Sequence, residues 1–279
     1  MIPGAPSRTA ISAATHRAAH QLLDGGCIFA DRLALRILNA EPAEILASAS
    51  AEPARGAIRL FIACRHRVAE DAVARAVADG VRQVVVLGAG LDTSAYRSVH
   101  GDDVIWFEVD YPATQAWKQR RLREAGIAVP GWLRFASIDF ETETLGARLA
   151  AAGFDALAPS IFIWLGVVPY LTEAAIFATL EYIGGLPGGS EVVFDYADPP
   201  ANWPAELRPM LDARAARVAA MGEAWISFFE PAPLAERLRG LGFVEIRDFL
   251  SGPIIAEYLP EFAVTERARG GHILWARSG

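Results

Sequence analysis

The chain has 279 residues, of which 53% are hydrophobic and 21% are charged, so it can bury a sizeable core and is too apolar to be disordered. Its formal net charge of −7 argues against a broad basic surface for nucleic acid, and no apolar run approaches the ~20 residues that span a bilayer. The two cysteines, Cys27 and Cys64, form neither a disulfide framework nor a zinc spacing; with no apolar signal-peptide stretch, they predict reduced thiols in a cytoplasmic protein.

The N-terminal part is predicted to be helical. Apolar residues recur at helical spacing through the first 60 residues, and Gly25-Gly26 separates the first two helices. A further helix is predicted over residues 65–79 and ends at Gly80. Its apolar face consists of Val68, Ala72, Val73, Ala76 and Val77.

Short apolar segments that are predicted to be strands follow. They lie at residues 84–87, 104–109, 133–137, 161–164, 191–196, 243–249 and 272–276. Helical segments lie between most of them; one begins after Thr172, a predicted N-cap, and another contains Leu234 and Leu238. This alternation predicts an α/β fold with a mostly parallel sheet and helices on both faces. In such a sheet the ligand lies beyond the carboxyl ends of the strands.

We expect a single domain over residues 1–279, with no repeat or linker. A helical N-terminal cap (1–64) precedes a cofactor-binding core (65–198). Residues 199–228, which are rich in proline and tryptophan, either cover the acceptor pocket as a lid insertion or form a plain packed connection. Residues 229–279 hold the C-terminal helix and the last strands.

The turn after the first predicted strand contains Gly88, Ala89 and Gly90. Glycines at this place let the backbone turn tightly and approach a ligand closely. A dinucleotide site would need a third glycine where this chain has Thr93, and the carboxylate of Asp92 would repel a pyrophosphate. Asp92 suits a cationic group such as an amino-acid ammonium. The alternative is a tight strand-to-helix turn that binds nothing.

Two acidic residues, Glu108 and Asp110, lie at the end of the second predicted strand. An acidic residue about 20 positions beyond the glycine turn binds ribose hydroxyls in nucleotide-binding α/β folds. Alternation points both side chains to the same side, and Asp110 is our prediction because it is nearer the strand end. The alternative is a solvated N-cap for the helix that begins near Pro112.

Asp139 and Phe140 follow the third predicted strand. Asp139 could bond an adenine amino group while Phe140 packs on the ring, although for these two residues by themselves a simple turn is the favoured interpretation. Taken with the glycine turn and Asp110, they describe a pocket for an adenosine that carries a cationic amino acid. That is the outline of S-adenosylmethionine.

Several segments carry a family resemblance, in the order in which the family has them. The most specific is RQVVVLGAGLDTSAYR, at residues 82–97; the others are residues 17–24, 29–34, 63–67, 107–112, 118–122, 166–172 and 241–243. In these segments the chain resembles the leucine carboxyl methyltransferase family, especially its bacterial small-molecule branch. The resemblance covers nearly the whole chain. It implies a Rossmann-like class I methyltransferase fold with a seven-stranded sheet, an antiparallel last strand and a helical N-terminal cap.

The resemblance also implies roles. It implies an S-adenosylmethionine-dependent O-methyltransferase, with carboxylates as the best-known acceptors and hydroxyls as the alternative. By position, Arg65 would pair with the methionyl carboxylate, as a guanidinium does well. Gly88 and Gly90 would line the cofactor, with Asp110 on the ribose and Asp139 and Phe140 on the adenine. One departure is Leu165, where many relatives have a glutamate; Asp92 or backbone carbonyls would then hold the ammonium group.

The acceptor side is less defined. No general base can be assigned, and His20, Tyr170 and Tyr196 are candidates for the acceptor pocket, with packing as the alternative role for each. The expected partner is a small-molecule acceptor, for example a polyketide or another secondary metabolite; a homodimer is considered, and no nucleic acid, membrane or metal is expected. Two rival functions are a non-catalytic methyltransferase-fold binding protein, to which Leu165 points, and an NAD-dependent oxidoreductase, against which Asp92 argues.

Overall fold

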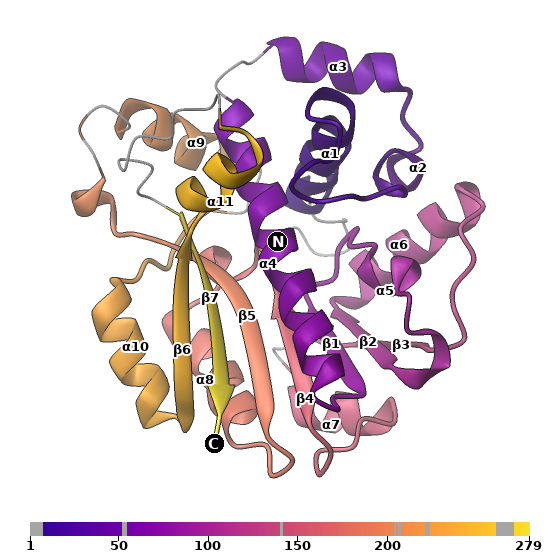
Figure 1. The fold of residues 1–279 in the computed structure, drawn as a ribbon, viewed down its shortest axis with the longest axis vertical. Coiled ribbons are helices and arrows are strands. Elements are labelled where there is room, and N and C mark those ends of the chain that lie inside the picture. Colours follow the sequence, from indigo (N-terminus) through magenta and orange to yellow (C-terminus); the bar gives the residue numbers. More distant parts are fainter. Residues whose placement is uncertain are drawn as a thin grey trace.

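The computed structural model describes residues 8–51, 55–139, 142–203, 205, 208–220, 224–260 and 271–279. At the centre of this described part is a seven-stranded sheet in the order β3-β2-β1-β4-β5-β7-β6 (Figure 1). The strands are β1 (Gln83–Leu87), β2 (Ile105–Asp110), β3 (Leu133–Ser137), β4 (Ser160–Trp164), β5 (Ser190–Ala197), β6 (Phe243–Leu250) and β7 (Gly271–Ser278). β1 to β5 pair in parallel, whereas β7 is antiparallel to its neighbours β5 and β6. All the predicted strands are confirmed, and so is the antiparallel last strand.

The helices alternate with the strands, as the sequence predicts. They are α1 (Arg8–Leu23), α2 (Ala34–Leu38), α3 (Pro42–Ala51), α4 (Arg55–Ala78), α5 (Ser94–Arg97), α6 (Pro112–Glu124), α7 (Leu145–Ala151), α8 (Glu173–Gly184), α9 (Arg208–Ala220), α10 (Pro231–Gly240) and α11 (Ser251–Tyr258), with short 3-10 helices η1 (Gly101–Asp103), η2 (Val168–Tyr170) and η3 (Pro200–Asn202). Thr172 is the N-cap of α8, as predicted: its hydroxyl accepts a hydrogen bond from the Ala175 N–H at 3.3 Å. α4 begins ten residues earlier than the predicted start at residue 65, because Leu60 and Ala63 join the same buried cluster as Val68.

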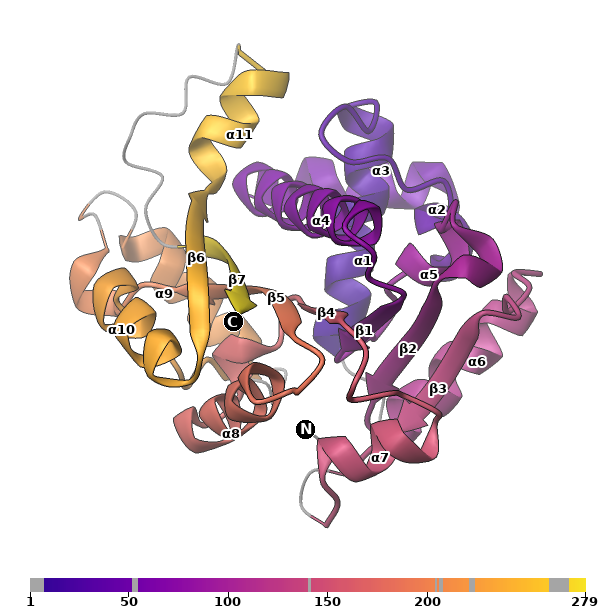
Figure 2. The same cartoon turned by 60° about the horizontal axis from the view of Figure 1, so that its bottom comes forward.

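The helices cover both faces of the sheet (Figure 2). On one face α4 and α11 pack over a cluster that includes Val84 and Val86 of β1. On the other face α7, α8 and α10 pack over a cluster that includes Val85 and Leu87 of the same strand. Every residue of β1 is buried, which explains why residues 84–87 are continuously apolar rather than alternating.

The N-terminal cap lies beyond one end of the sheet. In Figure 1, α1, α2 and α3 lie above the carboxyl ends of the parallel strands, which run opposite to the arrowhead of β7. α9, which belongs to the predicted lid insertion, lies beyond the same end on the side of β6. The loops that follow β1, β2, β4 and β5 therefore face the cap. Within the part of the chain that the structure describes, no helix is both long and apolar enough to cross a bilayer.

Candidate functional site

The turn after β1 can only be made with glycine at two positions. Gly88 has a φ of +63° and Gly90 a φ of +42°, a region that disfavours side chains. A Cβ atom at position 88 would clash with Val167 in the loop after β4. A Cβ atom at position 90 would lie 2.9 Å from the Cβ of Ala10 on α1. The turn is thus closely packed between the loop after β4 and the cap, whereas its approach to a ligand stays a prediction.

Asp110, at the end of β2, is hydrogen-bonded to this turn. Its Oδ2 accepts from the Gly90 N–H at 2.6 Å, and its Oδ1 accepts from the Tyr111 N–H at 2.7 Å. Burial raises the pKa of Asp110, and these two N–H groups oppose that shift. Each carboxylate oxygen can accept a second hydrogen bond. Asp110 therefore lies where the ribose prediction requires it, beside the glycine turn and with acceptor capacity left.

Glu108, the alternative ribose ligand, has another role in the structure. It is 1% exposed, and its Oε2 lies 2.8 Å from the Nζ of Lys118 on α6 and 3.4 Å from the Tyr96 hydroxyl. Burial raises the pKa of Glu108 to about 7, despite the opposing ammonium of Lys118. Alternation correctly placed Glu108 and Asp110 on one side of β2, but a helix above the strand covers Glu108. Its inclusion among the cofactor ligands is corrected to a buried ion pair.

Asp92 is a buried carboxylate in the same turn. Its Oδ1 accepts from the Ser94 N–H at 2.7 Å, and its Oδ2 lies 3.7 Å from Nδ1 of His66. Burial opposes ionisation, but the neighbouring imidazole of His66 and the positive charges of Arg17 and Lys118 lower the pKa of Asp92. Burial, helped by Arg17, lowers the pKa of His66 well below its usual value. At neutral pH Asp92 is therefore a buried anion that faces a neutral imidazole, which is a setting that favours binding of a cation.

Arg65 of α4 lies at the carboxyl ends of β4 and β5, as its predicted role requires. Its Nη1 is 3.0 Å from Oδ2 of Asp195 at the end of β5. A Cβ atom at Gly166 would lie 2.8 Å from both terminal nitrogens of Arg65, so the guanidinium packs directly on the loop that carries Leu165. Its Nε is buried without a hydrogen-bond partner among the described residues. This nitrogen leaves a donor for an incoming acceptor such as a carboxylate.

The predicted adenine residues follow β3. The Ile138 N–H donates to the Asp110 carbonyl at 3.0 Å, which places the following residue, Asp139, next to the end of β2. Asp139 is half-buried, and its N–H donates to Oε2 of Glu143 at 3.0 Å. Phe140 lies outside the described residues.

The first of the three acceptor-pocket candidates, His20, has the packing role that the sequence left open. His20 is fully buried: Nδ1 lies 2.8 Å from Oδ2 of Asp24, and Nε2 accepts from the Phe29 N–H at 3.4 Å. Both ring nitrogens are therefore engaged within the cap. Asp24 in turn binds the guanidinium of Arg59 at 2.7 and 3.0 Å.

The two tyrosine candidates follow or belong to the central strands β4 and β5. Tyr170 ends η2, after β4, and is half-buried. Tyr196 is buried near the end of β5, its hydroxyl donates to Asp248 of β6, and its ring stacks on His272 with centroids 4.7 Å apart. Burial, followed by the hydrogen bond to Asp248, raises the pKa of Tyr196 further above its usual value, so it is not a ready base.

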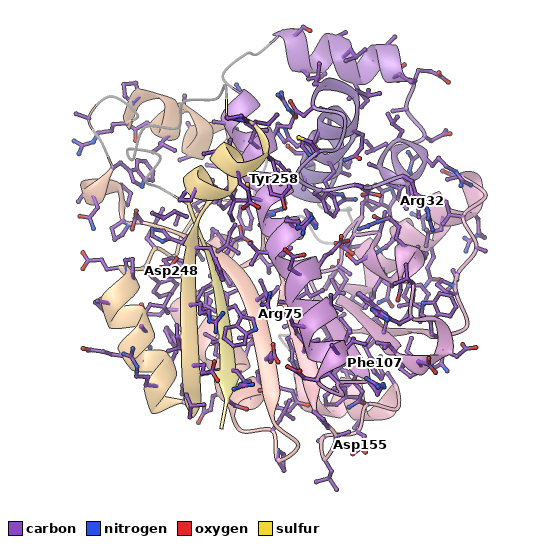
Figure 3. All side chains as sticks on the ribbon, viewed as in Figure 1. Arg32, Arg75, Phe107, Asp155, Asp248 and Tyr258 are labelled. Carbon is purple, nitrogen blue, oxygen red and sulfur yellow. The ribbon has the colours of Figure 1, made fainter. Side chains whose placement is uncertain are left out.

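The other predicted site residues, those of the glycine turn together with Arg65, Asp110 and Asp139, lie at the carboxyl ends of the parallel strands. In Figure 3, Asp248 lies toward the end of the sheet that faces α9, whereas Asp155, which precedes β4, lies at the opposite end of the molecule. The sequence reasoning missed several residues at the functional end, among them Asp195, Lys118, Arg17 and Asp31. The only signal for Asp195 was an acidic residue near the carboxyl end of an apolar strand.

The chain is similar in sequence to proteins described as methyltransferases. A family model described as leucine carboxyl methyltransferase matches residues 10–184. Two relatives carry the name "Putative S-adenosyl-L-methionine-dependent methyltransferase": one from Bacillus subtilis, 39% identical over 123 residues, and one from Mycobacteroides abscessus, 30% identical over 225 residues. The matches cover 43% and 79% of this chain but only 40% and 62% of those two proteins.

Solved structures agree on the fold. A DUF574 family protein from Streptomyces avermitilis superposes with a TM-score of 0.61 at 18% identity, over 95% of this chain and 97% of that chain. A protein from Thermobifida fusca, whose structure is titled as that of a putative methyltransferase, superposes with a TM-score of 0.57 at 15% identity, over 99% and 96% of the two chains. At these identities the similarity shows the α/β architecture alone.

Proposed function

This chain belongs to the leucine carboxyl methyltransferase family, and on that premise we propose that it transfers the methyl group of S-adenosylmethionine to an oxygen atom of a small-molecule acceptor. The names of the relatives support the methyl donor. The observation that carries the proposal is the 2.6 Å hydrogen bond from the Gly90 N–H to Asp110, because it joins the two elements from which an adenosine site is built.

The residues present fit the methyl donor at both of its ends. The turn at Gly88 and Gly90 lacks side chains because Val167 and Ala10 pack against it, and Asp110 beside it would hold the ribose. Asp139, with Phe140 as predicted from the sequence, would hold the adenine.

At the amino-acid end, the buried Nε of Arg65 would donate to the carboxylate, and the Asp92 carboxylate would accept from the ammonium group. Position 165 is leucine in this chain, next to Gly166. The Asp195 carboxylate accepts from the N–H of Gly166 and pairs with Arg65, which it holds in place. When bound, S-adenosylmethionine supplies an already activated methyl group. The chain then has to align the acceptor oxygen with the methyl group and exclude water.

We propose a carboxylate as the acceptor group. A carboxylate is ionised at neutral pH and needs no general base, whereas a phenol or an alcohol would need one. His20 and Tyr196, two of the candidates for the acceptor pocket, are held in internal hydrogen bonds, and the pKa of Tyr196 is raised, so neither is a ready base.

The dinucleotide alternative is disfavoured by the same turn. The pyrophosphate of NAD would lie against the buried anion Asp92, and the repulsion between these negative charges would weaken the binding of NAD.

A calorimetric titration tests the proposal. The protein is titrated with S-adenosylhomocysteine, and with NADH as the control ligand. We expect micromolar binding of S-adenosylhomocysteine alone, followed by methyl transfer in a screen that compares carboxylic acids with phenols. Binding of NADH alone, or of neither ligand, would overturn the proposed cofactor. Transfer to phenols alone would overturn the proposed acceptor group.

A further inference from the structure

One arginine of the N-terminal cap is hydrogen-bonded to the turn after β1. Arg17 of α1 is 3% exposed, and its Nη2 donates to the main-chain carbonyl of Leu91 at 2.6 Å. Its Nε donates to Oδ2 of Asp31 at 3.1 Å. The guanidinium therefore holds a loop of the cap with one edge and the turn after β1 with another, a geometry that the planar fork of arginine permits and a lysine does not.

Asp31, in the loop between α1 and α2, binds the same turn at Thr93, the residue that follows Asp92. Its side chain is fully buried, and Oδ2 accepts from the Thr93 hydroxyl at 2.8 Å. Oδ1 accepts from the Leu33 N–H at 3.0 Å and lies 3.3 Å from Nε of Arg97, which follows Thr93 by one turn. A buried carboxylate with this many donors holds its partners in a defined geometry.

The cap also contacts the turn directly. α1 passes so close to Gly90 that a Cβ atom there would lie 2.9 Å from the Cβ of Ala10. The cap therefore touches the turn at Gly90, Leu91 and Thr93. Asp92 is the residue between the last two of these contacts.

We propose that Arg17 and Asp31 are positioning residues for the amino-acid end of the cofactor. By holding the Leu91 carbonyl and the Thr93 hydroxyl, they fix the orientation of the Asp92 carboxylate, which accepts the ammonium group. The inference rests on the proposed function, since it presupposes that the turn binds this cofactor. It adds that residues of the cap, which touch no part of the cofactor themselves, determine how well the turn binds it.

The arrangement couples the docking of α1 on the turn to the binding of the cofactor. Binding free energies at linked sites are reciprocal, so if docking of α1 strengthens cofactor binding, cofactor binding must strengthen docking of α1 by the same factor. A ligand that lacks the amino-acid end should produce much less coupling, because it leaves Asp92 without a partner.

The decisive experiment compares two ligands on matched variants. Arg17→Met removes the bonds to Leu91 and Asp31 but keeps an unbranched apolar side chain. Thr93→Val removes the hydroxyl that donates to Asp31 and accepts from Arg97. The control is Arg59→Met, which breaks the link between α4 and Asp24 of the cap without touching the turn. Affinities for S-adenosylhomocysteine and for methylthioadenosine, which lacks the amino-acid end, are measured by calorimetry alongside the melting temperature.

We expect Arg17→Met to weaken S-adenosylhomocysteine about tenfold or more, within the usual range of coupling between sites, and to leave methylthioadenosine within about threefold. Thr93→Val should show the same selectivity with a smaller loss. Arg59→Met should change neither affinity, even if it lowers the melting temperature. Equal losses for both ligands, or none for S-adenosylhomocysteine, would overturn the inference, while a wild-type protein that does not bind S-adenosylhomocysteine would overturn the proposed function itself.

A second measurement uses the unaltered protein, so it does not depend on folding of a variant. Hydrogen exchange of the α1 amides is followed with no ligand, with S-adenosylhomocysteine and with methylthioadenosine, each at saturation. We expect S-adenosylhomocysteine to slow exchange in α1 about tenfold and methylthioadenosine clearly less. Equal protection by the two ligands would contradict the role of Asp92 as the link.

Discussion

Asp195 at the end of β5 lies 3.0 Å from the Nη1 of Arg65 on α4, and the other oxygen of its carboxylate accepts the N–H of Gly166 at 2.5 Å. One carboxylate thus joins three elements at the carboxyl ends of the central strands. It also supplies negative charge directly beside position 165, where the chain has leucine. Arg65 is consequently held at Nη1, while its Nε is buried without a hydrogen-bond partner among the described residues.

This relationship predicts that Asp195 acts on the cofactor through Arg65. Arg65→Met should weaken S-adenosylhomocysteine by about tenfold or more, because a hydrogen bond to a charged group contributes about 1.5–3 kcal/mol, and it should spare methylthioadenosine. Asp195→Asn should weaken the same ligand less, since the amide oxygen can still accept from Gly166. The double variant should be no worse than Arg65→Met alone, as calorimetric titrations would show. Additive losses would mean that the two residues act independently.

The contrast between Asp110 and Glu108 gives a second prediction. The two carboxylates share one side of β2, but Glu108 is neutralised by Lys118, whereas Asp110 is bound to main-chain N–H groups beside the turn. Asp110→Ala should weaken S-adenosylhomocysteine by an order of magnitude or more, because it removes ribose hydrogen bonds worth about 1.5–3 kcal/mol. Glu108→Gln is the matched control and should leave the affinity within about threefold. The ribose assignment fails if the folded Asp110 variant binds as the wild type does.

These pairs also show which parts of the site the sequence could predict. The strands and the glycine turn are local features: a continuous apolar run makes β1, and two glycines with positive φ follow it. Asp110 was found because its distance along the chain from Gly90 reflects the fixed geometry of a strand–helix–strand unit. The sequence could therefore locate the glycine turn and place Asp110 beside it, while the ribose role of Asp110 stays a prediction.

The partners of the buried charges could not be predicted, because they come from distant segments. Arg65 and Asp195 are 130 residues apart, and Thr93 and Asp31 are 62 apart. Nothing in a local pattern tells which helix will lie over Glu108 or that a cap residue such as Arg17 will reach Leu91. These contacts depend on how the helices pack, so a buried arginine on an amphipathic helix looks the same in the sequence as a solvated one.

His272 gives a prediction for the dependence of stability on pH. Its Nδ1 lies 3.0 Å from Oδ1 of Asp248 and its Nε2 lies 3.2 Å from Oδ2 of Asp198, while the ring stacks on Tyr196, whose hydroxyl also binds Asp248. A neutral imidazole has only one N–H and can donate to only one of these carboxylates. Although burial opposes the charge, Asp248 and then Asp198 raise the pKa of His272 above its usual value of 6.5.

A raised pKa in the folded state means that His272 stabilises the protein fully below about pH 6.5 and that this contribution is lost as the pH rises through the folded-state value. The wild type should therefore exceed His272→Gln in unfolding free energy most at pH 5.5. The difference should shrink steadily toward pH 9, by about 1.4 kcal/mol for each unit by which the pKa is raised. Denaturant unfolding at several pH values measures it, and a difference that grows with pH would contradict the ion pairs.

The pair formed by Lys118 and Glu108 gives the last prediction. Both side chains are 1% exposed, so removing one partner leaves a buried charge without compensation. Lys118→Met should lower the unfolding free energy at pH 8 by about 3–5 kcal/mol. Without the ammonium, the pKa of Glu108 rises further above the value of about 7 that burial gives it, so the carboxyl becomes neutral as the pH falls. The loss should therefore be smaller at pH 5.5 than at pH 8.

The double variant Lys118→Met with Glu108→Gln separates the charge from the packing. It removes both charges, so it should recover much of the stability at pH 8 and show little of the pH dependence of Lys118→Met. Urea unfolding of the three proteins at pH 5.5 and pH 8 decides the matter. If Lys118→Met loses the same free energy at both pH values, the loss comes from the contact of the Lys118 ammonium with the Tyr96 ring rather than from the uncompensated carboxylate.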